Sequence, residues 1–289
     1  FNIKEPFKGL FTQGMVCHET YKDEDNNWIS PDELISKDGK KFLKNDTSKQ
    51  VKVGPSESMS KSKKNTIDPE NIINNYGADS VRLFILSDSP PEKDVQWSEE
   101  GIIASYKFIQ KLWSLNEKIL EEINKNHPKN SSSELKKYTN KFIKKISNNL
   151  ENFHYNIIVA NLHEMYSFLS KEIIKGYQKE TILENYKKIL ITMMPILPHL
   201  SSECFETLKN DNEKINWPKF DEKYIREDEN IVVIQINGKK RGLINTKLDL
   251  EENDLLKLVI KDQNINKYLI DKEIRKKIYI KNKLINIII

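Results

Sequence analysis

Residues 54–65 bring together side chains that are suited to binding phosphate groups. The stretch from Gly54 to Asn65 is rich in serine, carries three lysines and has no apolar periodicity. We therefore expect a mobile loop rather than a strand or a helix. Asp68 and Pro69 follow and predict the start of a helix. Lysine ammonium groups and hydroxyls beside a helix N-terminus, where backbone N–H groups lack partners, favour a polyphosphate ligand.

The loop contains the five-residue motif Ser58-Met59-Ser60-Lys61-Ser62. By composition alone, a lysine-rich run is also typical of a solvated surface, and that interpretation stays open at this point. The motif resembles the second ATP-binding motif of class I aminoacyl-tRNA synthetases, which is usually written Lys-Met-Ser-Lys-Ser. Ser58 stands in place of its first lysine, whereas Lys61 matches its second. The resemblance implies that Ser58, Met59, Ser60, Lys61 and Ser62 form an ATP-binding loop.

Further matching segments run in order along essentially the whole chain. They are Glu5-Pro6-Phe7, Thr12 to Val16, Pro90 to Ser98, Leu197 to Leu200 and Val233 to Gly242. Together they resemble the leucyl-tRNA synthetases of bacterial or organellar type, and the last segment is the most distinctive. Two alternatives stay open: a valine, isoleucine or methionine enzyme of the same class, and a non-catalytic tRNA-binding protein derived from such an enzyme.

The resemblance implies a two-step reaction, in which leucine is activated by ATP and then transferred to tRNA-Leu. ATP is expected as its Mg²⁺ complex, bound as a substrate, and no metal site is predicted in the chain itself. Lys61 is the predicted catalytic residue, because a lysine beside the departing pyrophosphate stabilises charge that builds up in the transition state. The class also needs a His-x-Gly-His motif, which none of the five histidines forms. We therefore expect the C-terminal part of a longer enzyme, inactive alone.

Positive charge gathers towards the end of the chain. Residues 231–289 carry 13 Lys and Arg against 7 Asp and Glu, whereas residues 1–230 carry 34 against 36. This asymmetry predicts a surface that binds a polyanion, and the resemblance implies tRNA. The predicted contacts are Lys239, Lys240, Arg241, Arg275, Lys276 and Lys277. Arg82, which lies among apolar residues, is predicted either to form a salt bridge or to contact the tRNA acceptor stem.

Apolar spacing and capping residues predict the elements on either side of the loop. Leu10 to Cys17 is largely apolar and is predicted as a buried strand, with a close backbone approach at Gly14. The helix that Asp68 caps is expected to stop at a glycine. Asp79 is then predicted to cap a second short helix.

The rest of the chain divides into a helical part and a strand-rich part. Ser98 opens the first of four or five amphipathic helices with short links, which predict a bundle; Trp113 is placed on the apolar face of the first. From residue 231 the apolar period changes to two. Asn237-Gly238 then predicts a hairpin within a small β-β-α-β-β module.

The expected fold is therefore multidomain, α/β plus all-α. The resemblance implies the end of a Rossmann-type catalytic domain, a helical-bundle tRNA-binding domain and a small α+β C-terminal domain. The predicted ranges are residues 1–97, 98–228 and 229–289.

Cysteine usage and hydropathy exclude several other classes of protein. The two cysteines, Cys17 and Cys204, belong to no Cys-x-x-Cys pair, so neither a zinc site nor a disulfide framework is indicated. The longest apolar run, Leu284 to Ile289, is far too short to cross a bilayer, and no secretory signal is visible. We expect a cytoplasmic protein that is monomeric and does not bind membranes.

Overall fold

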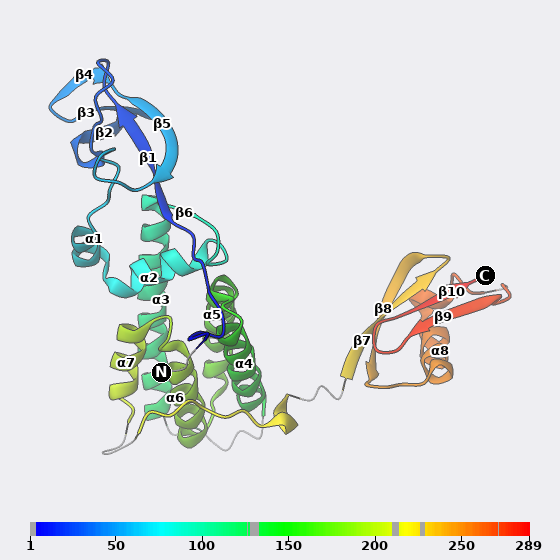
Figure 1. Ribbon diagram of the computed structural model, residues 1–289. Helices are drawn as coiled ribbons and strands as arrows, with labels where there is room; N and C mark the ends of the chain where they lie inside the picture. Colours follow the sequence, from blue (N-terminus) through cyan, green and yellow to red (C-terminus); the bar gives the residue numbers. More distant parts are fainter. Residues whose placement is uncertain (1–3, 126, 128–132, 210–213, 226–228, 271) are drawn as a thin grey trace. The chain divides into compact units, whose positions relative to one another are not determined.

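The computed structural model describes residues 4–125, 127, 133–209, 214–225, 229–270 and 272–289. The chain divides into two compact units, Phe1–Phe220 and Asp221–Ile289 (Figure 1). The finer division into three domains stays a prediction. Its second boundary, after residue 228, falls outside the described residues.

The first unit begins with a three-stranded sheet in the order β5-β1-β6. Strand β1 (Val16–Lys22) pairs antiparallel with β5 (Lys52–Ser58) and parallel with the short β6 (Val95–Gln96). The prediction of a strand over Leu10 to Cys17 is wrong for most of its length, because the strand begins only at Val16 and Leu10 is 94% exposed. Apolar composition alone cannot separate a buried strand from an apolar segment that lacks a strand partner.

The loop is shorter than predicted, because strand β5 extends into it. Residues 54–58 belong to this strand, so the loop itself begins at Met59. Pro55 is compatible with the strand because β5 lies at the edge of the sheet, where a missing backbone N–H removes no bond to a further strand. The predicted close approach at Gly14 is confirmed: its backbone N–H donates to the Pro91 carbonyl over 2.8 Å, and a Cβ at Gly14 would lie 2.1 Å from the Lys93 carbonyl oxygen.

A second small sheet is inserted between β1 and β5. A single 3-10 turn (Pro31–Glu33) leads into β2 (Leu34–Lys37), β3 (Lys40–Leu43) and β4 (Asp46–Gln50), which pair antiparallel in chain order. The β2–β3 hairpin turns at Asp38 and Gly39, whose φ values of 49° and 74° suit a tight turn of the primed type.

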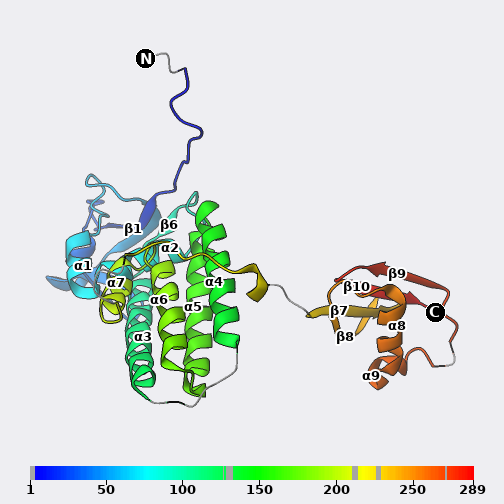
Figure 2. The same ribbon diagram turned by 90° about the horizontal axis from the view of Figure 1, so that it is seen from below.

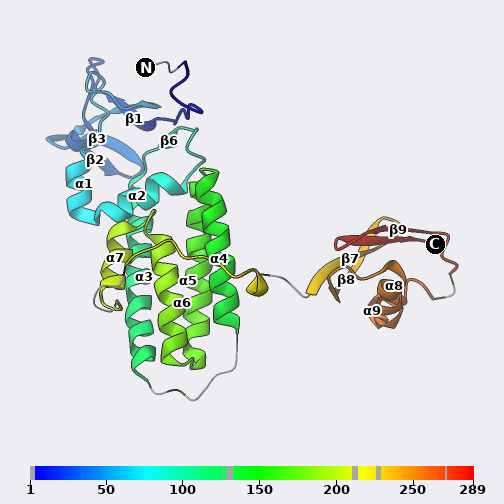
Figure 3. The same ribbon diagram turned by 60° about the horizontal axis from the view of Figure 1, so that its bottom comes forward.

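Two short helices follow the loop and lie between the sheets and the bundle (Figure 3). Helix α1 (Pro69–Tyr76) has Asp68 at its N-cap, where the carboxylate accepts from the Glu70 N–H over 3.0 Å, and it ends at Gly77, as predicted. Helix α2 (Ala78–Ser87) begins without a side-chain cap, so the prediction that Asp79 caps this helix is wrong. The Asp79 carboxylate instead bonds a helix far along the chain.

The rest of the first unit is the predicted helical bundle (Figure 2). Its helices are α3 (Glu99–Asn124), α4 (Glu134–Glu151), α5 (Tyr155–Glu172), α6 (Lys179–Met193) and α7 (Pro198–Glu206), with a 3-10 turn over Ile173–Lys175. Fully buried side chains from α3 to α6 meet in one apolar core, among them Ile119, Ile146, Ile158, Leu162, Ile182 and Ile189. Trp113 is 40% exposed, against prediction, because the buried face of α3 runs through Leu112 and Leu115.

Helix α2 is joined to the end of the bundle by two side chains that lie one turn apart. The Asp79 carboxylate accepts from the Leu200 N–H over 2.7 Å and from the His199 N–H over 3.3 Å, at the start of α7. Arg82 donates to the Pro195 carbonyl over 2.7 Å and to the Ile196 carbonyl over 3.1 Å, between α6 and α7. Among the described residues no carboxylate pairs with Arg82, so these carbonyls take the place of the expected salt bridge.

The second unit is a four-stranded sheet with helices packed on one face. A 3-10 turn (Glu222–Tyr224) precedes β7 (Glu229–Ile236) and β8 (Lys239–Lys247), followed by α8 (Glu252–Lys261), α9 (Gln263–Asn266), β9 (Lys276–Ile280) and β10 (Leu284–Ile288). The strand order is β8-β7-β10-β9, with β7 and β10 parallel. Asn237 and Gly238 form the hairpin turn, with φ of 49° and 75°. The predicted β-β-α-β-β module is confirmed, and the short helix α9 follows α8 within it.

Removing the Asp79 carboxylate should destabilise the first unit. Asp79→Ala leaves two backbone N–H groups at the start of α7 without their acceptor, which we expect to cost about 1–3 kcal/mol. The urea midpoint followed by tryptophan fluorescence measures the effect, because Trp28, Trp97, Trp113 and Trp217 all lie in this unit.

The matched control is Asp88→Ala, an exposed aspartate at the end of the same helix. It should leave the urea midpoint within error of the wild type. Equal midpoints for Asp79→Ala and Asp88→Ala would contradict a capping role for Asp79.

Candidate functional site

The loop of residues 59–65, called here the lysine loop, leaves the sheet where β5 ends opposite β1. Ser58, the last residue of β5, pairs with Cys17, and the Met59 N–H donates to the Val16 carbonyl over 3.3 Å. A tight turn over residues 61–64 follows, closed by the Lys64 N–H on the Lys61 carbonyl at 3.2 Å. Lys64, the last residue of the turn, has a φ of 52°, in the left-handed region. The loop is therefore a compact turn on a short stem.

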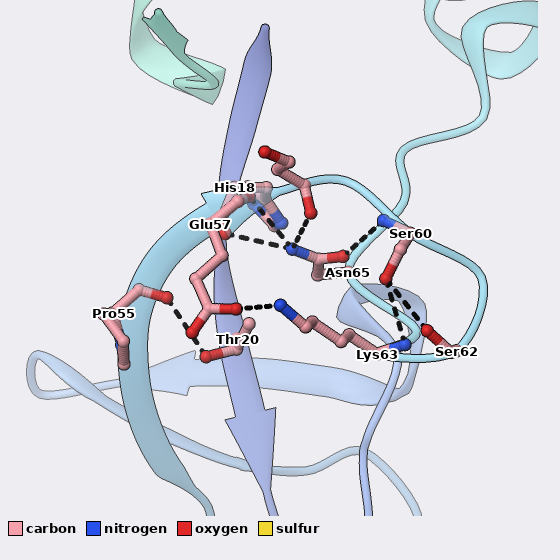
Figure 4. A network of polar contacts seen from close by, with 9 residues as sticks. His18, Thr20, Pro55, Glu57, Ser60, Ser62, Lys63 and Asn65 are labelled. Atoms are coloured by element: carbon pink, nitrogen blue, oxygen red, sulfur yellow. Dashed lines mark hydrogen bonds and ion pairs between the residues drawn. The ribbon is translucent and has the colours of Figure 1, made fainter.

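The base of the lysine loop is held by the side chain of Asn65, which is completely buried. Its Oδ1 accepts from the Ser60 N–H over 2.9 Å, and its Nδ2 lies 3.2 Å from the carbonyl oxygens of both His18 and Glu57 (Figure 4). We did not predict a role for Asn65. The only sequence signal for it was its place just after the lysine motif.

The hydroxyl groups of the predicted motif bond within the loop. Ser60 Oγ and Ser62 Oγ lie 3.2 Å apart, and Ser60 Oγ also accepts from the Lys63 N–H over 3.3 Å (Figure 4). Ser58 is exposed at the end of β5 and Met59 is half-buried. The structure thus gathers all five motif residues into one stem and turn.

The three lysines of the lysine loop have different surroundings. Lys63 pairs with the Glu57 carboxylate on β5 (Figure 4). Lys61 and Lys64 are exposed, and within the described part of the chain neither side chain has a hydrogen bond or an ion pair. The turn therefore presents Lys61 and Lys64 to an incoming anion, whereas Lys63 is already paired.

A cleft of about 680 Å³ lies beside the stem of the loop. Its lining includes His18, Trp97, Glu19 and Glu99. The Nδ1 atom of His18 and the Nε1 atom of Trp97 are buried and have no hydrogen-bond partner among the residues that are described. Burial lowers the pKa of His18 below its ordinary value, although Glu19 and Glu99 oppose the shift.

In the second unit the strand register brings the predicted basic residues to one end of the sheet. Lys239 is opposite Ile236, Ile236 is opposite Ile287, and Lys276 is opposite the following residue, Ile288. The hairpin residues on β8 and those at the start of β9 therefore lie at the same end of the sheet but on opposite edges. With strands about 4.8 Å apart, the three intervals between these edges span roughly 14 Å.

These basic residues differ in whether their side chains already have a partner within the unit. Lys277 pairs with Glu252 over 2.9 Å, and the Arg241 guanidinium lies 4.3 Å from the centre of the Tyr268 ring. Arg275 is exposed at the start of this edge, with its backbone N–H on the Ile288 carbonyl. Lys239, Lys240 and Lys276 are exposed and have no carboxylate partner among the described residues. The sequence predicted both basic runs but not that they lie at the same end of the sheet.

No group of three or more His, Cys, Asp and Glu side chains within the described ranges could hold a metal ion. None of the helices in the described part of the chain is long and apolar enough to cross a bilayer.

Two family profiles match the chain. Residues 50–98, which contain the lysine loop, match the class I tRNA synthetases for isoleucine, leucine, methionine and valine. Residues 132–259 match the anticodon-binding domain of tRNA ligases. The first profile covers the predicted ATP-binding motif, and the second covers most of the bundle and the start of the second unit.

The curated relatives that match are ligases for leucine, one of the four amino acids that the first profile covers. The leucine–tRNA ligase of Orientia tsutsugamushi is 43% identical over 100% of this chain, and that of Rickettsia bellii is 40% identical over 99%. The enzyme of Zymomonas mobilis is 37% identical over 99% of the chain. The chain is a leucine–tRNA ligase homologue along its whole length. It spans about a third of the length of these relatives, 33–34% in each case.

A solved structure agrees in fold. The crystal structure of the ternary complex of Agrobacterium radiobacter K84 agnB2 LeuRS with tRNA and LeuAMS matches 80% of this chain and 30% of its own, with a TM-score of 0.67. At 21% identity this match concerns the fold alone. The predicted resemblance to leucine–tRNA ligases is confirmed by the curated relatives along the whole chain, and the roles of individual site residues stay predictions.

The buried His18 should make the first unit of this leucine–tRNA ligase homologue less stable in mild acid. Its pKa is lower in the folded state than the ordinary 6.5, so the unfolded chain binds the proton more readily as the pH falls below that value. The free energy of unfolding should therefore fall between pH 7 and pH 5. In His18→Gln this fall should be smaller, as measured by urea midpoints at several pH values.

His154→Gln is the control, because His154 is exposed. Its pH dependence should match that of the wild type. A wild-type slope retained in full by His18→Gln would show that His18 does not bind the proton differently in the two states.

Proposed function

We propose that this chain is the part of a leucine–tRNA ligase that carries the second ATP-binding motif and the tRNA-binding domains. The observation that carries the proposal is the 43% identity with the Orientia tsutsugamushi enzyme across the whole chain. Leucine would attack the α-phosphate of ATP to give leucyl-adenylate and pyrophosphate, and the leucyl group would then pass to the terminal ribose of tRNA-Leu. The chain corresponds to the C-terminal third of such an enzyme.

Lys61 is the residue to which we assign the catalytic contribution of this part. It lies on the exposed turn of the lysine loop, whose stem is held by hydrogen bonds to the sheet. Its ammonium group would meet the charge that builds up on the phosphates as pyrophosphate departs, which stabilises the transition state more than the ground state. Ser58, Met59, Ser60 and Ser62 shape the loop that covers the phosphates. ATP enters as its Mg²⁺ complex, as a substrate.

The basic end of the second unit is assigned to tRNA. Lys239, Lys240 and Lys276 are exposed at one end of the sheet without carboxylate partners among the described residues, an arrangement suited to phosphate groups. Arg241, Arg275 and Lys277 lie beside them. Arg82 retains donors beyond the two used on Pro195 and Ile196, and an acceptor-stem contact there is part of the same proposal. We propose a monomeric cytoplasmic enzyme with the three-domain arrangement described from the sequence.

Leucine-dependent exchange of pyrophosphate into ATP by the complete enzyme tests this proposal. Lys61→Ala should lower the exchange rate on the order of 100-fold, because one preorganised electrostatic donor is lost, while tRNA affinity stays near that of the wild type. The exchange assay with filter binding of tRNA measures both.

Lys52→Ala is the matched control, since Lys52 is exposed on β5 just before the loop. It should change neither quantity. Exchange that depends on valine, isoleucine or methionine instead of leucine would favour another enzyme of the class. Wild-type tRNA binding without any exchange would favour a non-catalytic tRNA-binding protein.

Deleting residues 231–289 from the complete enzyme should weaken tRNA binding and reduce its dependence on salt. A narrower change, Lys240→Ala with Lys276→Ala, should reduce the slope of log affinity against log salt by about 1 for each phosphate contact that is lost. Lys257→Ala on α8 is the control, because Lys257 is paired with Asp254. An unchanged slope in the double variant would contradict phosphate contacts at this end of the sheet.

A further inference from the structure

The lysine loop has a stem that is held to the sheet and an exposed turn over residues 61–64. The side chain of Asn65 makes the hydrogen bonds that hold the stem. We propose that Asn65 is a positioning residue for the predicted ATP-binding loop: its buried amide fixes the stem and confines movement to residues 61–64. The inference rests on the proposed function for its catalytic consequence, but its structural content is independent of that function.

The contacts of Asn65 reach every strand segment at the base of the loop. Its Nδ2 group faces the His18 carbonyl on β1 and the Glu57 carbonyl on β5, each at 3.2 Å, with the Ser58 carbonyl at 3.5 Å. Its Oδ1 accepts from Ser60 N–H, on the outgoing side of the loop. Because Asn65 itself begins the returning side, one side chain ties both sides of the loop to the sheet (Figure 4).

Only asparagine supplies this set of bonds at this position. The site needs one acceptor for an N–H group and two donors for carbonyl oxygens, and the short asparagine amide offers both at once. Aspartate has the same shape, but its carboxylate would face the carbonyl oxygens without a hydrogen to donate. Alanine would leave these buried backbone groups without partners, and an unpaired buried polar group is costly.

The free part of the loop carries the groups that are assigned to ATP. Residues 61–64 form the exposed turn, with Lys61 outside the network that Asn65 makes. Lys63 forms a second tie, to Glu57, but both side chains are about one-third exposed. An exposed ion pair contributes little and exchanges readily with another anion, whereas the buried amide does not. Phosphate groups therefore have access to Lys63 only by displacing Glu57, and Asn65 stays in place.

Hydrogen exchange of the wild-type protein tests the fixed stem directly. The Ser60 N–H should exchange at least 10-fold more slowly than the N–H groups of Lys61 and Ser62, for which no acceptor is found among the described residues. Equal exchange at all three positions would overturn the inference, whatever the activity of the enzyme.

Kinetics of the complete enzyme test the consequence for ATP. A loop that is displaced by about 1 Å can cost on the order of 100-fold in rate, so Asn65→Asp should lower kcat/KM for ATP in the exchange reaction by roughly 10- to 100-fold. The KM for leucine should stay near the wild-type value. Asn71→Asp, on the exposed side of α1, is the matched control and should leave both parameters unchanged.

The pH profile separates positioning from general damage. Protonation of the carboxyl introduced by Asn65→Asp restores one hydrogen-bond donor to the carbonyl oxygens, so the activity of this variant relative to wild type should rise as the pH falls. Asn65→Ala has no such group and should show no relative rise. Parallel profiles for the two variants, or a KM for leucine raised as much as the KM for ATP, would refute a positioning role. A wild-type enzyme without exchange activity would instead refute the proposed function alone.

Discussion

A strand that leaves a sheet frees backbone groups that must find other partners, and the first unit is organised around one solution to this requirement. Near the end of the pairing between β1 and β5, the carbonyl oxygens of the register partners His18 and Glu57 each lie 3.2 Å from the Asn65 Nδ2 group. A buried carbonyl without a donor is unfavourable, so the chain returns and places the Asn65 amide between them. This contact gives the lysine loop a rigid stem and an exposed tip. The proposed phosphate-binding role of this turn would use both features, because its charges must be mobile enough to close and yet return to one position.

The same principle connects the loop to the helical bundle. The first N–H groups and last carbonyls of a helix have no partner within the helix. Asp79 supplies acceptors to the start of α7, and Arg82 supplies donors to carbonyls that follow α6. Both side chains lie on α2, which follows α1 and therefore the lysine loop. A continuous series of short elements thus joins the loop to the bundle.

The second unit combines a compact apolar core with many positive charges at its surface. These charges repel one another unless the fold keeps them apart. Its apolar side chains come from β7, β10, α8 and α9 and meet on the helix-covered face. The basic residues lie on or beside the two outer strands at one end, so the charges are separated across the sheet by the two inner strands. Stacking of Arg241 on Tyr268 and pairing of Lys277 with Glu252 fix two of them in place. A surface of this kind is suited to the spaced phosphates of a nucleic acid.

The sequence by itself determined the features that depend on near neighbours. The Asp68 cap, the glycine stop of α1, the amphipathic helices, the Asn237-Gly238 hairpin and the lysine motif are all local patterns, and the structure contains each of them. The tertiary structure decided whatever depended on a distant partner. Asp79 bonds residues some 120 positions away, the burial of Asn65 depends on β1, and the first strand begins at Val16 only because β5 and β6 pair with it there. No local pattern encodes such partners, since a carboxylate or an amide has the same local sequence signature whether it bonds its own helix or one that the fold brings beside it.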